Sequence, residues 1–257
     1  MFKTAMILNI NSMNALPVME RWLGQIHAPE TFSRIGPWLT RYQSYRACPP
    51  PPEMYADVER YGYYNWRVTE LWYKEPYPQP GILPQAFFPN YKTVLGMSQD
   101  LASDVSEWSG RQEGPRTAAR YVVPARATED FLGSDRPLND YRSILRWYMV
   151  FKYPAGVDRE EADRWYLECH AKEVLKQPGL TRFLSHRVVT PKPGEPDIWH
   201  RASELWYDDF DAWRNAVIVS PPEYTKPPWA TRDTYPFFAP FVDFVSTFIL
   251  EAPSNNF

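Results

Sequence analysis

The sequence predicts an α+β protein made of two tandem βαββαβ units with antiparallel sheets, one over residues 1–133 and one over residues 140–257. The first observation is a repeated stretch. ERWLGQIHAPE at residues 20–30 returns 143 positions later as DRWYLECHAKE at residues 163–173. In both copies an acid, an arginine and a tryptophan are followed, five residues after the tryptophan, by His, Ala, any residue and Glu.

Two further blocks repeat in the same order. LTRYQSYR at 39–46 returns 141 positions later as LTRFLSHR, and RVTELWY at 67–73 returns 134 positions later as RASELWY. Spacing that shrinks only between blocks is typical of a duplicated unit whose loops have changed length. We therefore interpret the chain as two copies of one ancestral unit.

The first unit contains the expected order of elements. Alternation and short apolar runs predict strands at 4–10, 39–47, 65–73 and 118–123, and a helix that Ser12 or Asn14 caps and that ends near residue 27. Four consecutive prolines at 49–52 favour an extended loop, because proline has no amide donor. A second helix is predicted at 94–108, after a proline-rich segment at 76–89, and residues 125–139 are expected to form a linker.

The second unit repeats this order. Strands are expected at 144–152, 181–189, 198–207 and 242–250, and a long proline-rich loop at 221–240 precedes the last of them. Asp158 and Glu161 have the spacing of a helix capping box. The helix from Phe210 onwards begins after two aspartates, which favour a helix N-terminus. An open sheet face on each unit would be apolar, so the two units are expected to bury these faces against each other.

Composition excludes several classes of function. The chain has 257 residues, a formal charge of -3 and a pI near 5.9, and no clustered basic face for nucleic acid is evident. Only Cys48 and Cys169 occur, so we expect neither a disulfide framework nor a thiolate metal site. No segment has the length and apolarity of a signal peptide or a membrane span, which favours a cytoplasmic protein that contacts no membrane.

The repeated helix ending in His-Ala-x-Glu, within a duplicated βαββαβ order, resembles the dimeric α/β-barrel superfamily with its ferredoxin-like fold, and within it the EthD-like group. That group shows a tryptophan followed by a His-x-Pro motif. Residues 27–29 match the motif, whereas residues 170–172 depart from it at the proline. The resemblance implies two units packed as a pseudo-dimeric α/β barrel, with ligand between a sheet and its helices. Relatives include cofactor-free isomerases, polyketide cyclases, anthrone-type monooxygenases and haem-binding members, and fold alone does not choose among them.

Histidine is the first candidate for chemistry. His27 with Glu30, and His170 with Glu173, are three residues apart, so each carboxylate can reach its imidazole on a helix and raise its pKa towards neutrality. The structural alternative is a surface His-Glu pair. The second unit also has His186 and His200 where the first has Tyr45 and Trp66. We therefore expect proton transfer in the second unit, through His170, Glu173, His186 and His200. The histidine spacing matches no metal-ligand motif, so no metal is expected.

Arginines and aromatic rings are the candidate substrate contacts. Arg187 and Arg201 are expected to hold a carboxylate, with walls from Trp165, Trp206 and Tyr207. The first unit offers a second candidate site of His27, Glu30, Tyr45, Arg46 and Arg67. The alternative for Arg67 and Arg201 is an ion pair with Glu70 or Glu204, but side chains three apart on a strand point to opposite faces.

These features predict a cofactor-independent isomerase that acts on a small, unsaturated, anionic product of aromatic ring cleavage, of muconolactone type. A polyketide cyclase or decarboxylase and a haem or anthrone-type monooxygenase are alternatives within the enzyme class. A small-molecule binding protein without catalysis is the alternative outside it. An open pocket beside His170 with arginine and aromatic walls would favour catalysis, and a packed interior would favour the binding protein. A fused pair of this kind can also form a homodimer through its outer edges.

Overall fold

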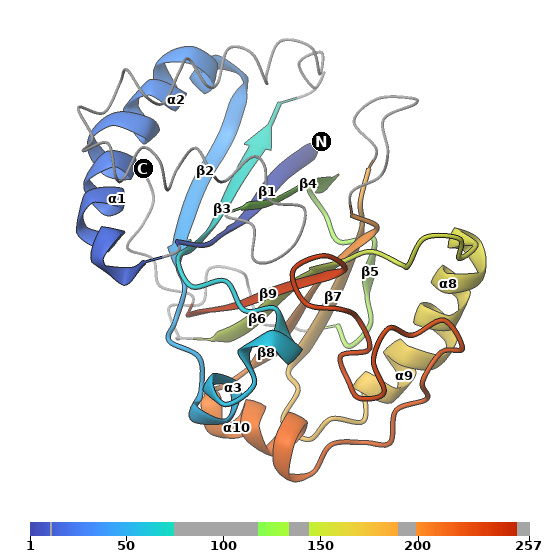
Figure 1. Cartoon of the computed structure of the whole chain (residues 1–257). Helices are drawn as coiled ribbons and strands as arrows, with labels where there is room; N and C mark the ends of the chain where they lie inside the picture. The colour runs from blue at the N-terminus through green and yellow to red at the C-terminus, as the bar shows by residue number, and fades with distance from the viewer. Residues whose placement is uncertain (11, 75–117, 134–143, 190–198, 251–257) are drawn as a thin grey trace.

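The computed structural model describes residues 1–10, 12–74, 118–133, 144–189 and 199–250. It has mixed α+β architecture with two antiparallel sheets (Figure 1). The first sheet has the order β2-β3-β1-β4, and the second has the order β5-β7-β8-β6-β9. Apart from β5, the second order repeats the first, strand for strand.

The strands are β1 Phe2–Leu8, β2 Leu39–Arg46, β3 Arg67–Tyr73, β4 Ala118–Pro124, β5 Glu129–Asp130, β6 Leu145–Phe151, β7 Arg182–Arg187, β8 Arg201–Tyr207 and β9 Phe244–Leu250.

One long helical segment connects β1 to β2 in the first half and β6 to β7 in the second half. In the first half it consists of η1 Met13–Ala15, α1 Leu16–Trp22, the π-turn η2 Leu23–His27, α2 Ala28–Ile35 and η3 Gly36–Trp38. In the second half it consists of α8 Arg159–Trp165, the π-turn η5 Tyr166–His170 and α9 Ala171–Val174. The remaining helices are α3 Pro52–Tyr55, α4 Val58–Tyr61, α10 Phe210–Arg214 and η6 Asn215–Val219.

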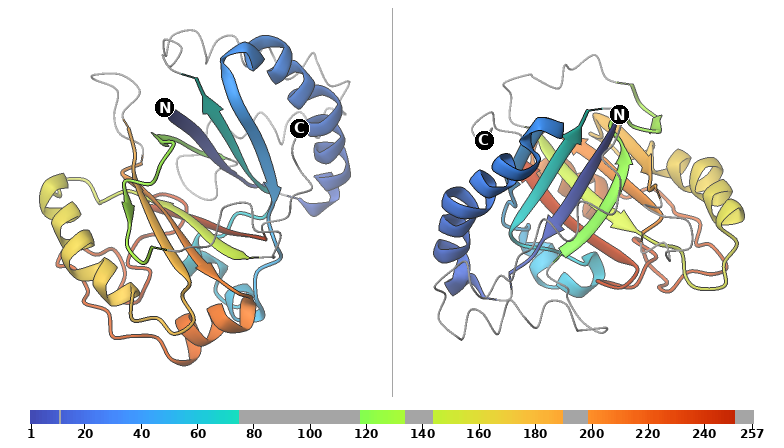
Figure 2. Two further views of the ribbon diagram at one scale, coloured as in Figure 1. Left: turned by 180° about the vertical axis from the view of Figure 1, so that it is seen from behind. Right: turned by 90° about the horizontal axis from the view of Figure 1, so that it is seen from above.

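The sheets lie together in the middle of the molecule, and the helices cover their outer faces. Figure 2 shows α1 and α2 on one side and α8 and α9 on the opposite side. One buried cluster draws side chains from both sheets, including Ile7 and Val68 from the first and Val150 and Val245 from the second. The inner faces of the two sheets therefore share a core, because each would otherwise leave its apolar strand face in water.

Strands at the edges of the two sheets also contact each other. Cys48, just after β2, donates its amide to the carbonyl of Phe248 in β9 at 2.7 Å. At the other edge Val189, just after β7, donates to the carbonyl of Val122 in β4 at 2.8 Å. Backbone hydrogen bonds thus join the halves at two seams, and each seam links the second strand of one half to the fourth strand of the other.

All eight strands expected from the sequence are present within one to three residues of the expected bounds. Asp158 caps α8 by accepting the amide of Glu161 at 2.9 Å, as its spacing predicted. The first helix, however, does not end near residue 27 but continues to Ile35. Pro29 lies directly after the π-turn, inside this continuous helical segment.

The four prolines at 49–52 were expected to form an extended loop. Residues 49–51 lie outside any helix or strand, and Pro51 has extended backbone, whereas Pro52 begins α3 because its fixed φ suits the first position of a helix. The expected linker at 125–139 was wrong in part, because it contains β5, which pairs with β7. The predicted helix at 94–108 and the segment at 76–89 lie outside the described residues, and the domain boundary between 133 and 140 stays a prediction. Among the helices of the described ranges, none has the length and apolarity to cross a membrane.

Candidate functional site

The two histidines of the repeated motif occupy the same local structure. His27 is the last residue of one π-turn and His170 is the last residue of the other. Each imidazole lies against the tryptophan five residues earlier, with ring centroids 4.5 Å apart for Trp22 and His27 and 5.0 Å apart for Trp165 and His170. π-Turns inside helices are frequent at functional sites. The sequence therefore located both candidate histidines correctly on equivalent helices.

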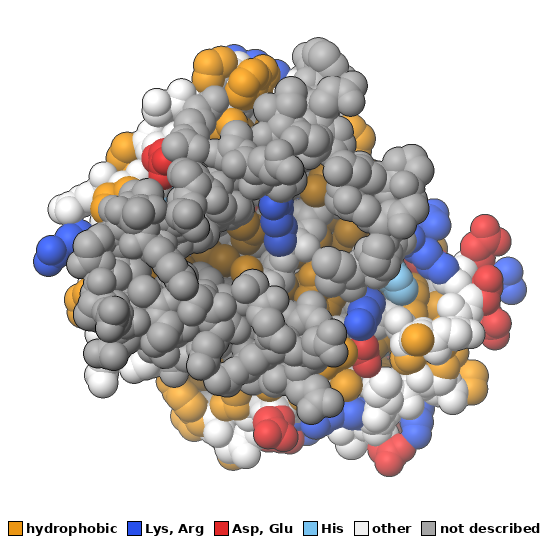
Figure 3. All heavy atoms as spheres, turned by 45° about the horizontal axis from the view of Figure 1, so that its top comes forward, with side chains coloured by type: hydrophobic (Ala, Val, Ile, Leu, Met, Phe, Trp, Pro, Cys, Tyr) orange, Lys and Arg blue, Asp and Glu red, His pale blue; other side chains and the backbone are white. Residues whose placement is uncertain are grey.

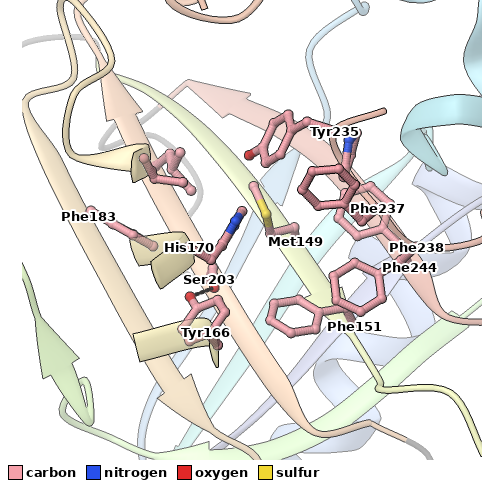
Figure 4. Close-up of a pocket in the computed structure, with 13 residues that line it drawn as sticks. Met149, Phe151, Tyr166, His170, Phe183, Ser203, Tyr235, Phe237, Phe238 and Phe244 are labelled. Carbon is pink, nitrogen blue, oxygen red and sulfur yellow. Dashed lines mark hydrogen bonds between the residues drawn. The ribbon is translucent and has the colours of Figure 1, made fainter. Parts of the chain in front are cut away.

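The surroundings of His170 are packed with aromatic rings from the loop at 221–240. Tyr235 stacks on His170 with centroids 5.7 Å apart (Figure 4). Tyr224 in turn stacks on Tyr235, with centroids 4.4 Å apart. The cavity left beside the imidazole has a volume of about 10 Å³, roughly the least space that can hold one water molecule. Among the described residues that line it, none is an arginine. The lining residues are Met149, Phe151, Tyr166, His170, Val174, Phe183, Ser203, Leu205, Tyr235, Pro236, Phe237, Phe238 and Phe244.

Glu173 affects the pKa of His170 less than the sequence suggested. Its carboxylate accepts hydrogen bonds from the amide and the hydroxyl of Thr225, at 2.9 and 2.6 Å, and so ties the 221–240 loop to α9. Burial lowers the pKa of His170 to about 4, and the charge of Glu173 only partly opposes this. The expectation of an imidazole that titrates near neutrality was therefore wrong, because loss of water around the ring outweighs the carboxylate.

Arg201 and Arg67, which were expected to hold a substrate carboxylate, are each paired with carboxylates of the protein. Arg201 is 2 % exposed and donates to Asp163 at 2.7 Å, to Glu129 at 2.9 Å and to Ser185 at 3.0 Å. Asp163 is the acid that opens the repeated motif, on α8. The sequence carried a signal for this pairing, since both copies of the motif begin with an acid, but only the fold shows that the helix lies over the arginine.

The equivalent pair in the first half has the same arrangement. Arg67 donates to Glu20 through Nε at 2.9 Å and through Nη2 at 2.5 Å, and to the hydroxyl of Ser44 at 3.2 Å. Trp66 also donates its indole N–H to Glu20, at 2.9 Å. Burial would raise the pKa of Glu20, but the bonds and charge of Arg67, with Trp66 and Arg46, hold it below its ordinary value. Glu20 is therefore an anion at neutral pH.

His186 and Trp206 lie on the other side of the second sheet from His170. They face the layer between the sheets, where Lys3 contacts Glu70 at 2.7 Å and Arg146 contacts Glu204 at 2.7 Å. His186 lies 4.0 Å from Glu204, and the indole of Trp206 donates to the same carboxylate at 3.2 Å. Because successive strand residues point to opposite faces, the sheet separates these side chains from the cavity at His170. The expected grouping of His170, His186 and Trp206 in one site was wrong.

The remaining expected residues of the second half are also dispersed. The Nδ1 of His200 accepts the amide of Tyr153 at 2.9 Å, which fixes the start of β8. The side chain of Arg187 is 53 % exposed and lies 3.7 Å from Asp163. The hydroxyl of Tyr207 is buried and donates to Gln177 at 2.5 Å. Only Trp165 stays with His170, as its stacking partner.

The second candidate site is divided in the same way. Tyr45 faces the layer between the sheets, with its hydroxyl donating to Gln43 at 2.5 Å. His27 and Glu30 lie on the outer helix and are partly buried. Burial lowers the pKa of His27 to about 4, so its imidazole is neutral at physiological pH. Arg46, at the end of β2, has a side chain that is 69 % exposed and contacts Glu20 at 3.0 Å.

A much larger cleft opens beside the first helix, with a volume of about 950 Å³. Roughly 300–1,000 Å³ is the usual size of a small-molecule site. The charged side chains of this cleft are those of Glu20 and Arg46, and its walls are formed by aromatic, proline and aliphatic side chains. The described lining residues are Asn9, Ile10, Met13, Leu16, Pro17, Glu20, Arg46, Ala47, Cys48, Pro49, Pro50, Tyr55, Val58, Tyr63, Asn65, Trp66 and Phe241.

On the face drawn in Figure 3, the coloured basic and acidic side chains are scattered and do not form one large patch of a single charge. Among the described residues, no three His, Cys, Asp or Glu side chains are placed together as metal ligands.

Comparison with known proteins gives a family match over part of the chain and likenesses to solved structures. A model of the chalcone isomerase N-terminal domain matches residues 1–110. No curated protein matches the chain. Among solved structures, an EthD family protein from Bacillus halodurans is 25% identical over 28% of this chain and 70% of its own, with a TM-score of 0.25. An anthrone oxidase-like protein is 10% identical over 97% of this chain and 90% of its own, with a TM-score of 0.46. Both TM-scores are below 0.5, so the fold is described from the strand orders given above and not from these likenesses.

Proposed function

We propose that the protein is a cofactor-independent isomerase or cyclase of a flat, unsaturated organic substrate, and that its first half carries the reaction. The observation that supports this most is the difference in open space. The helical segment that carries His27 lines a cleft of about 950 Å³ with its earlier residues, Met13 to Glu20, and His27 itself is not among the described lining residues. The cavity beside His170 measures about 10 Å³. A substrate needs room in the half that acts on it, and the match to the chalcone isomerase N-terminal domain falls on that same half.

His27 is the proposed proton carrier. Its neutral imidazole takes a proton from a carbon or hydroxyl of the substrate, and the resulting imidazolium returns the proton to a different atom of the same molecule. The reaction leaves no net change in electrons, so it needs neither oxidant nor reductant. The partly buried ring, held against Trp22, would stay in one orientation during both transfers.

The second half is proposed to be the structural partner of the first. Its strand order repeats that of the first half, and the two seams join second and fourth strands. These features support a tandem duplication whose two sheets close as a pseudo-dimeric α/β barrel. The aromatic loop fills the space beside His170, which supports a loss of ligand binding in that half.

Proton NMR in deuterated buffer tests this proposal. A hydroxychalcone and muconolactone are offered to the wild-type protein, and isomer change and deuterium uptake are followed. We expect His27→Ala to lower turnover of the accepted compound by about 100-fold or more, as loss of a general acid-base group does. His170→Ala is the matched variant and should retain turnover in proportion to its folded fraction. Equal activity of His27→Ala and wild type would refute the assignment.

A further inference from the structure

Among the described residues, the cluster at Glu20 pairs one carboxylate with two guanidinium groups. Glu20 contacts two guanidinium groups, that of Arg67 at 2.5 Å and that of Arg46 at 3.0 Å. Arg67 and the indole of Trp66 already donate three hydrogen bonds to this carboxylate. Arg46 is therefore not required to satisfy Glu20, and its side chain is 69 % exposed at the wall of the cleft.

The second half has the equivalent pair of arginines, but two carboxylates balance their charges. Arg201 and Arg187 correspond to Arg67 and Arg46, and Asp163 corresponds to Glu20. Here a second carboxylate is present, since Glu129 of β5 contacts Arg201 at 2.9 Å. Two carboxylates thus face two guanidinium groups. Among the described residues, the first sheet has no strand equivalent to β5.

The cleft around Arg46 suits a flat, largely apolar body. Trp66, Tyr63 and Phe241 supply rings, and Pro17, Pro49 and Pro50 supply rigid apolar surface. Tyr55, at the same wall, is 61 % exposed. Several of the other polar groups are already engaged: the amide side chain of Asn65 bonds both the N–H and the C=O of Ile10, each at 3.0 Å, and the indole of Trp66 donates to Glu20. The exposed guanidinium is thus the group that would select a ligand.

We propose that this cleft binds a flat aromatic carboxylate, with Arg46 as the anchor for the carboxylate and the rings of the cleft around the aromatic body. The inference deepens the proposed function, because it names the class of molecule that the first half takes. A guanidinium forms a paired hydrogen bond with a carboxylate, and such charge-assisted bonds are stronger than neutral ones. In the free protein Arg46 turns to Glu20, and the ligand carboxylate replaces that contact.

Calorimetric titration of the full chain with cinnamate tests the proposal, with cinnamamide as the neutral ligand of nearly the same shape. Cinnamate should bind at one site and cinnamamide about 10-fold or more weakly, since one charge-assisted contact is lost. Arg46→Met should remove this preference, and 0.5 M salt should reduce it. Arg187→Met is the matched variant, because Arg187 occupies the equivalent strand end in the charge-balanced half. It should bind cinnamate as wild type does.

Three results would overturn the inference: no binding of cinnamate, equal binding of the amide, or an Arg46→Met variant with unchanged affinity. An equal loss in Arg187→Met would also overturn it, because it would place the anion elsewhere. The titration needs no turnover, so it separates the two proposals. Cinnamate binding through Arg46 with normal turnover in His27→Ala would refute the proposed function alone. If His27→Ala loses isomerisation but Arg46→Met binds cinnamate as wild type does, this inference alone would be refuted.

Discussion

Arg201 lies with its Nε 2.7 Å from the carboxylate of Asp163, across the gap between the second sheet and the helix that covers it. Arg67 and Glu20 repeat this relationship in the first half. Each pair fixes the distance between a strand and the helix that carries the motif histidine. Arg201 and Arg67, which the sequence pattern assigned to substrate binding, therefore position the helix.

Removal of Arg201 should destabilise the protein without a specific effect on ligand binding. In Arg201→Met, two partly buried carboxylates lose their cation, and breaking a buried pair from one side costs about 3–5 kcal/mol. Urea denaturation measures the change in free energy of unfolding. Arg187→Met should change it by less than about 1 kcal/mol, because that arginine is exposed. A loss below 1 kcal/mol for Arg201→Met would contradict the structural role.

The ring of Tyr235 should determine whether the cavity at His170 can hold a ligand. Tyr235→Ala removes a buried ring and should lower the free energy of unfolding by about 3–5 kcal/mol. The space that it leaves is apolar and should take up toluene, detected by saturation-transfer NMR. Tyr235→Phe keeps the ring and should bind no toluene. Binding by both variants, or by neither, would show that this ring does not fill the cavity.

Buried neutral histidine should make stability depend on pH. The pKa of His170 falls from an ordinary 6.5 to about 4 on folding, so between these values the unfolded chain binds more protons. This contribution is fully present above pH 6.5 and is lost as the pH falls towards 4. It amounts to roughly 3 kcal/mol, since one pKa unit is about 1.4 kcal/mol.

His170→Phe keeps a ring in the aromatic cluster and removes the titrating group. Urea denaturation at several pH values between 4 and 6.5 should give a shallower slope for this variant than for wild type. His27 and His186, whose pKa values burial also lowers to about 4, contribute to the slope that is left, together with carboxylates whose pKa values are lowered in the folded protein, such as Glu20 and Glu204. Identical slopes for the two proteins would mean that His170 is not buried as a neutral ring.

The pH profile of turnover should report on His27. Because burial lowers its pKa to about 4, the neutral imidazole persists well below pH 6. We therefore expect kcat/KM to keep its value down to about pH 5 and to decrease through pH 4. Stopped-flow assays, kept brief to limit unfolding, measure this limb. A decrease centred near pH 6.5 would indicate a solvated histidine and contradict the described environment.

The sequence by itself determined the repeats, the eight strands and the position of both motif histidines on helices. Strand alternation also fixed which side chains share a face, as with Val68 and Glu70 on one side of β3 and Arg67 and Leu71 on the other. Such periodicity follows from local backbone geometry, which the residue pattern records directly. The acid at the start of each motif was also visible, although its partner was not.

Only the tertiary structure decided what each face meets. Alternation does not say that Arg201 faces a helix while Glu204 faces the other sheet, so His170 and His186 could not be separated from the sequence. The sequence of the proline-rich loop at 221–240 also did not predict that Tyr235 would lie against His170. This contact leaves a cavity of only about 10 Å³ beside the imidazole. Burial, which sets both the open volume and the pKa of each histidine, depends on chain segments far apart in sequence and exists only once they are packed together.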